Sequence, residues 1–224
     1  MKNSLPFNDT PVQITNYKQK GEFINRLIIS QEYKSYLEIG LGWAEAWNII
    51  VCENKVCVDP NPFPINPNGI TEFDPTYKMT SDEFFKKAES NLMFDIIYID
   101  GDHTADQVYR DTINSLNHLS SGGCLVLHDI GPATYIEEPS DNGGCGTAYK
   151  AWIKLRSTIK GVSMMSYIFE DHDVVGIIHF DNPDKKYSIE NKEYDDSWEF
   201  YKENTAEILN LKTYNEIIEN LESI

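Results

Sequence analysis

The chain has 224 residues, of which 41% are hydrophobic and 12% aromatic, a composition typical of one globular α/β domain. It carries 36 acidic and 19 basic residues, which gives a formal net charge of -17 without any cluster of Lys or Arg. Such a surface repels nucleic acid and anionic membranes, so we expect neither as a partner. No apolar run reaches the roughly 18 residues of a membrane-spanning helix, and the first residues lack the apolar core of a signal peptide.

The expected helices and strands alternate along the chain after an irregular segment at 1–20. Helices are expected at 23–32, 44–52, 104–119 and 147–159, and one more opens at Ser81 with Asp82 and Glu83 in its first turn. Strands are expected at 35–39, 55–59, 94–100, 124–128, 163–169 and 174–180. The proline-rich stretch 61–76 predicts a long loop with one short strand near 70–73, and the tail is predicted to be helical over 198–221.

The last two strands are joined only by residues 170–173, and so short a connection forces an antiparallel hairpin. The fold class is therefore α/β: a Rossmann-like, doubly wound, mostly parallel sheet with a C-terminal antiparallel strand hairpin. We expect an N-terminal irregular segment and helix at 1–34, the main domain at 35–180, and a helical C-terminal extension at 181–224 packed on the same domain. The apolar stripe of that extension favours packing on its own chain, with a homodimer contact as the alternative.

Four polar side chains follow two neighbouring apolar strands, at the point where each strand ends. They are Asp100 and His103 after the strand 94–100, and His128 and Asp129 after the strand 124–128. Parallel strands place their carboxyl ends on one edge of a sheet, where ligands bind, so we expect these groups to converge. Carboxylates with nitrogen ligands and a nearby base suit a divalent-metal catalytic site.

A glycine turn follows the first strand, with the sequence Glu38-Ile39-Gly40-Leu41-Gly42. Glycines there allow the backbone to approach a ligand, and Asp59 ends the next strand where an acid can bind ribose hydroxyls. The third glycine of a dinucleotide fingerprint is replaced by Glu45. The two glutamates of this segment would repel a pyrophosphate, and they suit a cofactor that has a positive centre and an amino acid tail.

In these features, residues 36–180 resemble a class I S-adenosylmethionine-dependent methyltransferase. The resemblance implies that Gly40 and Gly42 lie against the amino acid end of S-adenosylmethionine and that Glu38 lies near its amino group. It also implies that Asp59 takes the ribose hydroxyls and that Ser81 and Asp82 border the adenine. Asp100, at the end of the fourth strand of that pattern, is expected to serve both the cofactor and the metal.

The segment Asp100-Gly101-Asp102-His103 is similar to one subgroup, the metal-dependent O-methyltransferases of the catechol and macrocin type. The resemblance implies that Asp100, His128 and Asp129 bind a divalent metal, Mg²⁺ or Mn²⁺, and that His103 is the catalytic base. With an ordinary pKa near ~6.5, His103 would be largely neutral at pH 7. Better-known members carry an acid or amide pair where this chain has His128 and Asp129. The implied acceptor is a hydroxyl on a small molecule or glycan.

Three other functions stay open at this point. A cephalosporin hydroxylase-like enzyme would use His103, His128 and one Asp to bind redox iron. A non-catalytic scaffold would bind the cofactor alone, whereas a nicotinamide dehydrogenase is disfavoured by Glu38 and Glu45. The cysteines show no zinc-ligand spacing and are interpreted as buried free thiols of a protein in the reducing cytoplasm; they are Cys52, Cys57, Cys124 and Cys145.

Overall fold

The structure is a computed structural model, which describes residues 16–62, 75–132, 145–170 and 173–223. Within these ranges the helices are α1 (Asn16–Gln31), α2 (Glu45–Ile49), α3 (Ser81–Lys87), α4 (Ala105–Asn117), α5 (Ala148–Thr158), α6 (Trp198–Leu209) and α7 (Tyr214–Glu222). The strands are β1 (Ser35–Ile39), β2 (Asn54–Val58), β3 (Phe94–Ile99), β4 (Leu119–Leu127), β5 (Ile159–Lys160), β6 (Val162–Ile168), β7 (Val174–Phe180) and β8 (Ser188–Ile189).

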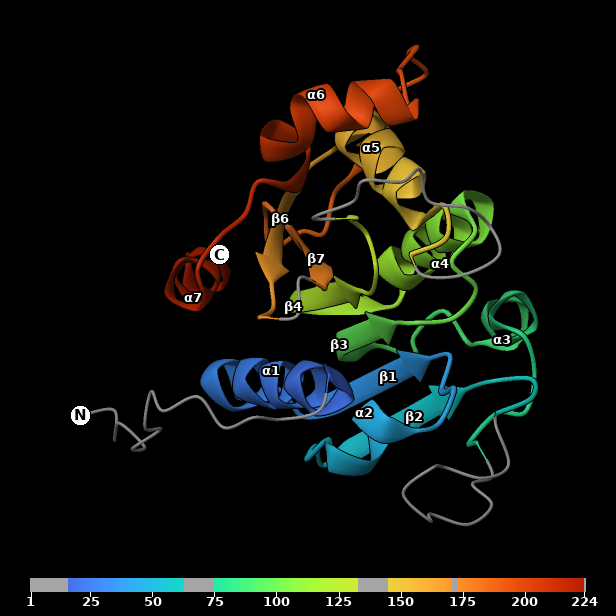
Figure 1. The fold of residues 1–224 in the computed structure, drawn as a ribbon. Helices are drawn as coiled ribbons and strands as arrows, with labels where there is room; N and C mark the ends of the chain where they lie inside the picture. The colour runs from blue at the N-terminus through green and yellow to red at the C-terminus, as the bar shows by residue number, and fades with distance from the viewer. Residues whose placement is uncertain (1–15, 63–74, 133–144, 171–172, 224) are drawn as a thin grey trace.

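Six strands form one sheet in the order β2-β1-β3-β4-β7-β6, as Figure 1 shows. The first four strands of this order are parallel to one another, and β7 is antiparallel to both β4 and β6. The expected fold class, with its parallel core and C-terminal antiparallel hairpin, is therefore confirmed. The short strands β5 and β8 pair separately.

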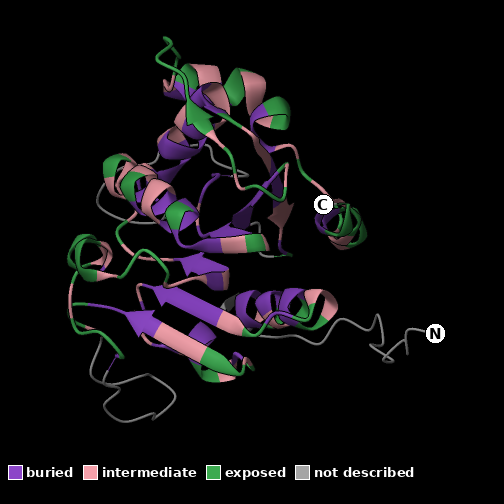
Figure 2. Ribbon diagram, turned by 180° about the vertical axis from the view of Figure 1, so that it is seen from behind, coloured by how far each residue is buried: buried purple, intermediate pink, exposed green. Residues whose placement is uncertain are grey.

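The sheet is buried on both faces, and its two faces belong to two hydrophobic clusters. Along β3, Ile97 and Ile99 pack with residues of α4, α5 and α6, while Ile96 and Tyr98 pack with residues of α1, α2 and α7. Figure 2 shows the buried residues concentrated in the strands and on parts of the helices. A parallel strand covered by helices on both faces has no polar face, which explains why this sequence is apolar without alternation.

Helix α1 begins at Asn16, so the expectation of an irregular chain up to residue 20 is wrong for residues 16–20. Helix α3 has Thr80 as its N-cap. The Thr80 side chain accepts a hydrogen bond from the backbone N–H of Glu83, whose side chain accepts one from the Thr80 N–H. This reciprocal pair satisfies two backbone donors at the start of the helix, and α3 begins at Ser81 as predicted.

The tail expected to be helical over 198–221 consists of two helices, α6 and α7, with a break at 210–213. Asn210 adopts a left-handed conformation with φ 48° and ends α6, and Thr213 caps the start of α7 with its side chain. Asparagine accepts this conformation more readily than most residues, so it serves as a helix stop. Strand β4 starts at Leu119, five residues before the expected start. The short strand expected near 70–73 lies outside the described residues.

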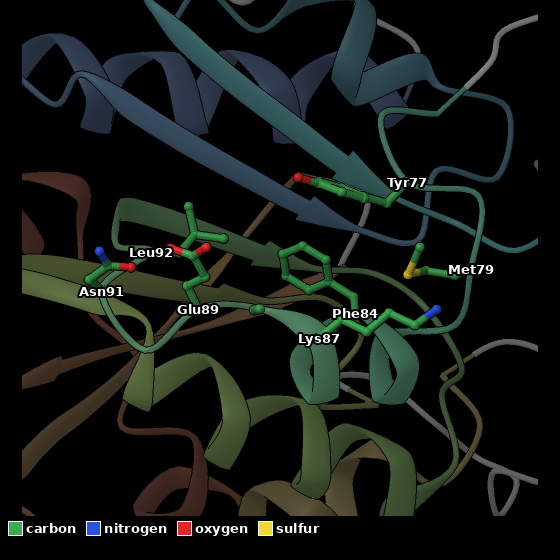
Figure 3. Close-up of a pocket in the computed structure, with 8 residues that line it drawn as sticks. Tyr77, Met79, Phe84, Lys87, Glu89, Asn91 and Leu92 are labelled. Atoms are coloured by element: carbon green, nitrogen blue, oxygen red, sulfur yellow. The ribbon is translucent and has the colours of Figure 1, made fainter.

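A crevice with a volume of about 540 Å³ lies beside α3 (Figure 3). It contains the rings of Tyr77 and Phe84, whose centroids are 5.1 Å apart. None of the described residues that line it belongs to the predicted site, so the crevice does not enter the functional argument. Within the described ranges, no helix has both the length and the apolar character needed to cross a membrane.

Candidate active site

The carboxyl ends of β1 and β3 approach each other closely at one edge of the sheet. Gly40 follows β1 with a φ of 82°, and a Cβ atom built there would lie 2.2 Å from the backbone oxygen of Asp100. That distance is far below contact for any side chain, so glycine is required for this approach. The glycine turn is thereby held against the first of the predicted metal ligands.

One cavity at this edge, about 450 Å³ in volume, is called here the glycine-turn cavity. The predicted cofactor residues that line it are Gly40, Gly42, Asp59, Ser81, Asp82 and Asp100. A second cavity, of about 380 Å³, is called the histidine cavity. The predicted residues that line it are Glu38, Gly42, Asp100, His103, His128 and Asp129. Because Gly42 and Asp100 line both, the two cavities adjoin.

Asp59 fixes the glycine turn to the end of β2. Its Oδ2 accepts a hydrogen bond of 2.8 Å from the backbone N–H of Leu41, and its Oδ1 accepts one of 2.7 Å from the N–H of Asn61. Each carboxylate oxygen accepts more than one hydrogen bond, so these contacts leave capacity for ribose hydroxyls. The ribose-binding role of Asp59 stays a prediction.

At the other end of the glycine-turn cavity, Gln107 connects Ser81 to a buried acid. Its Nε2 donates to Ser81 Oγ at 3.1 Å and to Asp111 Oδ1 at 2.9 Å. Burial raises the pKa of Asp111 to about 6, despite these polar neighbours. Gln107 and Asp111 thus add two hydrogen-bonding residues to the cavity that sequence reasoning missed, and both lie on α4, one turn apart.

Glu38 is buried in β1, one residue before the strand ends, and it lines the histidine cavity. Its Oε2 accepts a hydrogen bond of 2.5 Å from the hydroxyl of Tyr36. Burial raises the pKa of Glu38 to about 8, which outweighs the opposing effect of that hydrogen bond. The carboxyl is therefore mostly protonated at pH 7, and an ammonium group placed beside it would favour its ionised form.

The histidine cavity contains alternating imidazole and carboxylate groups. His128 Nδ1 lies 2.7 Å from Asp100 Oδ1, and His128 Nε2 lies 3.0 Å from Asp173 Oδ2. His103 Nε2 lies 3.2 Å from Asp100 Oδ1, and His103 Nδ1 lies 3.3 Å from Asp129 Oδ2. The predicted residues from β3 and β4 are therefore brought together, with Asp173 as an additional member.

Both histidines are held in their protonated form by these acids. Burial alone would lower the pKa of His103, but its hydrogen bonds and charge interactions with Asp100 and Asp129 raise it to about 10. The pKa of His128 is raised to about 9, since the nearby Asp100 and Asp173 likewise outweigh burial. The expectation of a largely neutral His103 at pH 7 is therefore wrong for this arrangement, because it did not include the two carboxylates that contact the ring.

Lys20 and Asp173 were not recognised from the sequence. Lys20 Nζ lies 2.6 Å from Asp173 Oδ2, and both residues come from outside the strand ends used to predict the site. Lys20 lies in α1, within the segment expected to be irregular. For Asp173 a signal existed: β7 runs antiparallel to β4, so the residue before β7 lies near the end of β4.

The donor set fits a divalent cation. Ligand atoms of Asp100, His103 and His128 lie within 4.8 Å of one another, and so do those of His128, Asp129 and Asp173. Divalent cations lie roughly 2.0–2.6 Å from N and O ligands, so two ligands of one ion can be up to about 5 Å apart. His128 Nδ1 is buried and approaches Asp100 without the alignment of a hydrogen bond. The predicted ligands Asp100 and Asp129 thus fall into two different sets, which share the third predicted ligand, His128.

A comparison with protein families matches residues 37–130 to the model described as a methyltransferase domain. No curated protein matches the chain in sequence. Among solved structures, a Klebsiella pneumoniae protein provisionally described as an O-methyltransferase is 11% identical, covers 77% of this chain and 84% of its own, and has a TM-score of 0.51.

Two further solved structures are similar over most of their length. The cofactor-bound Rv0187 protein from MTB is 11% identical with a TM-score of 0.52, over 76% of this chain and 83% of its own. The SAH-bound Podospora anserina methyltransferase PaMTH1 is 14% identical with a TM-score of 0.52, over 81% of this chain and 100% of its own. At such identities these similarities concern the fold, and they agree with the family model.

Proposed function

We propose that the chain is a class I S-adenosylmethionine-dependent methyltransferase, which methylates a hydroxyl of a small molecule or glycan with the help of Mg²⁺ or Mn²⁺; the match of residues 37–130 to a methyltransferase domain and the shared fold support this proposal. The observation that supports this proposal most is the junction of the two cavities. Gly42 and Asp100 line both the glycine-turn cavity and the histidine cavity, so a cofactor in the first would direct its methyl group toward the second.

The glycine-turn cavity suits the cofactor by its chemistry. Asp59 offers carboxylate oxygens for the ribose hydroxyls, and the polar groups near Ser81 and Asp82 border the position expected for the adenine. Glu38, in the adjoining cavity, is suited to the amino group of the methionine part. Its buried carboxyl would gain a positively charged partner there, which offsets the cost of its ionisation.

The histidine cavity supplies what hydroxyl methylation needs. A divalent cation held by Asp100, His128 and Asp129 would lower the pKa of an acceptor hydroxyl and orient it. A cation that shares the charge of the neighbouring carboxylates would lower the pKa of His103, and its neutral form could then take the hydroxyl proton. The acceptor oxygen then forms its bond to the methyl carbon while the carbon–sulfur bond breaks.

The test is binding followed by turnover. Calorimetry with S-adenosylmethionine and with Mn²⁺ or Mg²⁺ should show binding of both, and release of S-adenosylhomocysteine should follow with a member of a panel of catechols and sugars. Asp100→Asn and Asp129→Asn should abolish turnover and leave the fold intact. Asp184→Asn changes an acid that is 69% exposed and should retain full activity. Failure to bind the cofactor, or unchanged turnover in the site variants, would contradict the proposal.

An iron-dependent hydroxylase is the second candidate, favoured by one observation. The set of Asp100, His103 and His128 has two imidazoles and one carboxylate, the composition of many non-haem iron sites. Iron in the purified protein, with turnover that depends on oxygen, would support this candidate over methyl transfer. A reducing cytoplasmic location stays part of either proposal, and all four cysteines are free thiols in the structure.

A further inference from the structure

Lys20 is a buried cation in the wall of the histidine cavity, and the proposed reaction does not use it. It is 5% exposed, and its Nζ lies 2.6 Å from Asp173 Oδ2. Lysine is rarely buried to this extent, because its ammonium group loses hydration, so its position requires a charged partner or a ligand. Asp173 is a charged partner of this kind, and Lys20 itself lines the histidine cavity, where a ligand can approach it.

The packing of α1 places Lys20 beside the glycine turn. At the next residue, Gly21, a Cβ atom would come within 2.4 Å of Ile49 Cδ1 and 3.3 Å of the backbone oxygen of Ala46. The absence of a side chain therefore allows α1 to lie close against α2, as Figure 1 shows. Since α2 directly follows the turn, Lys20 lines the same cavity as Gly42 and Ala46.

The amino acid end of S-adenosylmethionine carries an ammonium group and a carboxylate. Glu38 is suited to the ammonium group, whereas a carboxylate needs a cationic donor in a cavity with so many acids. Among the described residues that line the histidine cavity, Lys20 is the only Lys or Arg. Burial alone would lower the pKa of Lys20, but the charges of Asp173, Asp100 and Asp129 outweigh burial and raise the pKa above its ordinary value. The ammonium group is therefore charged.

We propose that Lys20 binds the carboxylate at the amino acid end of the cofactor, while Asp173 holds the ammonium group of Lys20 in position. An ammonium group has three N–H donors, so the contact of Lys20 with Asp173 does not preclude a contact with the cofactor carboxylate. The inference rests on the proposed function, because it requires S-adenosylmethionine as the cofactor. It assigns one end of the cofactor to α1, outside the segment that matches the methyltransferase model.

The test compares two ligands that differ only in this carboxylate. Calorimetry on the full chain should show that S-adenosylmethionine binds about tenfold or more tightly than decarboxylated S-adenosylmethionine, the difference that a charge-assisted hydrogen bond confers. Lys20→Met should bring the ratio of the two affinities close to one. Lys186→Met is the matched control, since Lys186 also pairs with an aspartate, Asp184, at 2.9 Å, but is 79% exposed. It should keep the wild-type ratio.

Two results would overturn the inference: equal affinity of the two ligands in the wild-type protein, or a wild-type ratio in Lys20→Met. If Lys20→Met fails to fold because Asp173 loses this partner, the double variant Lys20→Met/Asp173→Asn removes both charges. The ratio of the two affinities is then measured on that variant, where it should also be close to one. Failure of the wild-type protein to bind either ligand would contradict the proposed function as well. Normal binding with an unchanged ratio would contradict the role of Lys20 alone.

Discussion

The two adjoining cavities are built in different ways. The glycine-turn cavity takes its polar groups from loops and helix starts that directly follow β1, β2 and β3, within or next to the segment 37–130. The histidine cavity combines residues at the ends of β3 and β4 with Lys20 from α1, and Lys20 and His128 both contact Asp173, which precedes β7. The residues of the glycine-turn cavity thus come from one continuous part of the sequence, whereas the histidine cavity requires distant parts of the chain to meet.

The two cavities also treat buried aspartates in opposite ways. In the glycine-turn cavity, burial raises the pKa of Asp111 to about 6, because its neighbours are mainly neutral hydrogen-bond donors. Burial would raise the pKa of Asp100 as well, but the charges and hydrogen bonds of His128 and His103 hold it far below its ordinary value. Asp100 is therefore an anion at any pH near neutrality, which a metal ligand must be.

The largest expected effect is on ligand affinity, when one residue of each cavity is changed in turn. Asp129→Asn should lower Mn²⁺ affinity by about 100-fold or more, since even outer partners of metal ligands contribute 10–100-fold, and it should leave cofactor affinity nearly unchanged. Asp59→Asn should do the reverse, with a loss of about tenfold in cofactor affinity, because a charged acceptor and one of its loop hydrogen bonds are lost. Calorimetry of both ligands on both variants measures this comparison.

A loss of both affinities in each variant would show that the cavities form one inseparable site, and the comparison would fail. Asp100→Asn is the internal reference, because Asp100 lines both cavities and should weaken both ligands. The exposed Asp184→Asn should weaken neither.

The difference between residues at strand ends and residues from distant segments explains which parts of the site could be predicted from the sequence. Strand ends in a parallel sheet must share an edge, so Asp59, Asp100 and Asp129 were placed correctly from the order of strands alone. Lys20 was missed because its contact with Asp173 joins residues 153 positions apart, and no local pattern marks such a pair. The protonation of His103 was missed for the same reason, since it depends on two acids from different strands.

A smaller effect is expected from two glycines of the turn that look equivalent in sequence. Gly40→Ala should lower the free energy of unfolding by about 3 kcal/mol, because the new Cβ would meet the backbone of Asp100, which cannot move without shifting β3. Gly42→Ala should cost only about 1 kcal/mol, the strain of its φ of 49°, since no heavy atom lies within 4 Å of the built Cβ. Urea unfolding of both variants measures the difference, and equal losses would show that the close approach of β1 and β3 does not limit stability.

The smallest effect concerns Asp111, whose charge the glycine-turn cavity compensates poorly. The pKa of this carboxyl is about 6 in the folded chain, above the ~3.9 of an unfolded aspartate, so the folded state binds its proton more tightly. Stability from this group is present below about pH 4 and is lost as the pH rises through about 6.

Asp111→Asn removes the charge and keeps an oxygen for the Gln107 amide, so we expect it to raise the free energy of unfolding by about 1 kcal/mol at pH 7 and not at pH 4. Asp100→Asn should show no such gain at pH 7, because its histidine partners favour the charged form. A gain for Asp111→Asn that persists at pH 4 would show that the effect is not electrostatic, and the contrast between the two cavities would then rest on packing instead of charge.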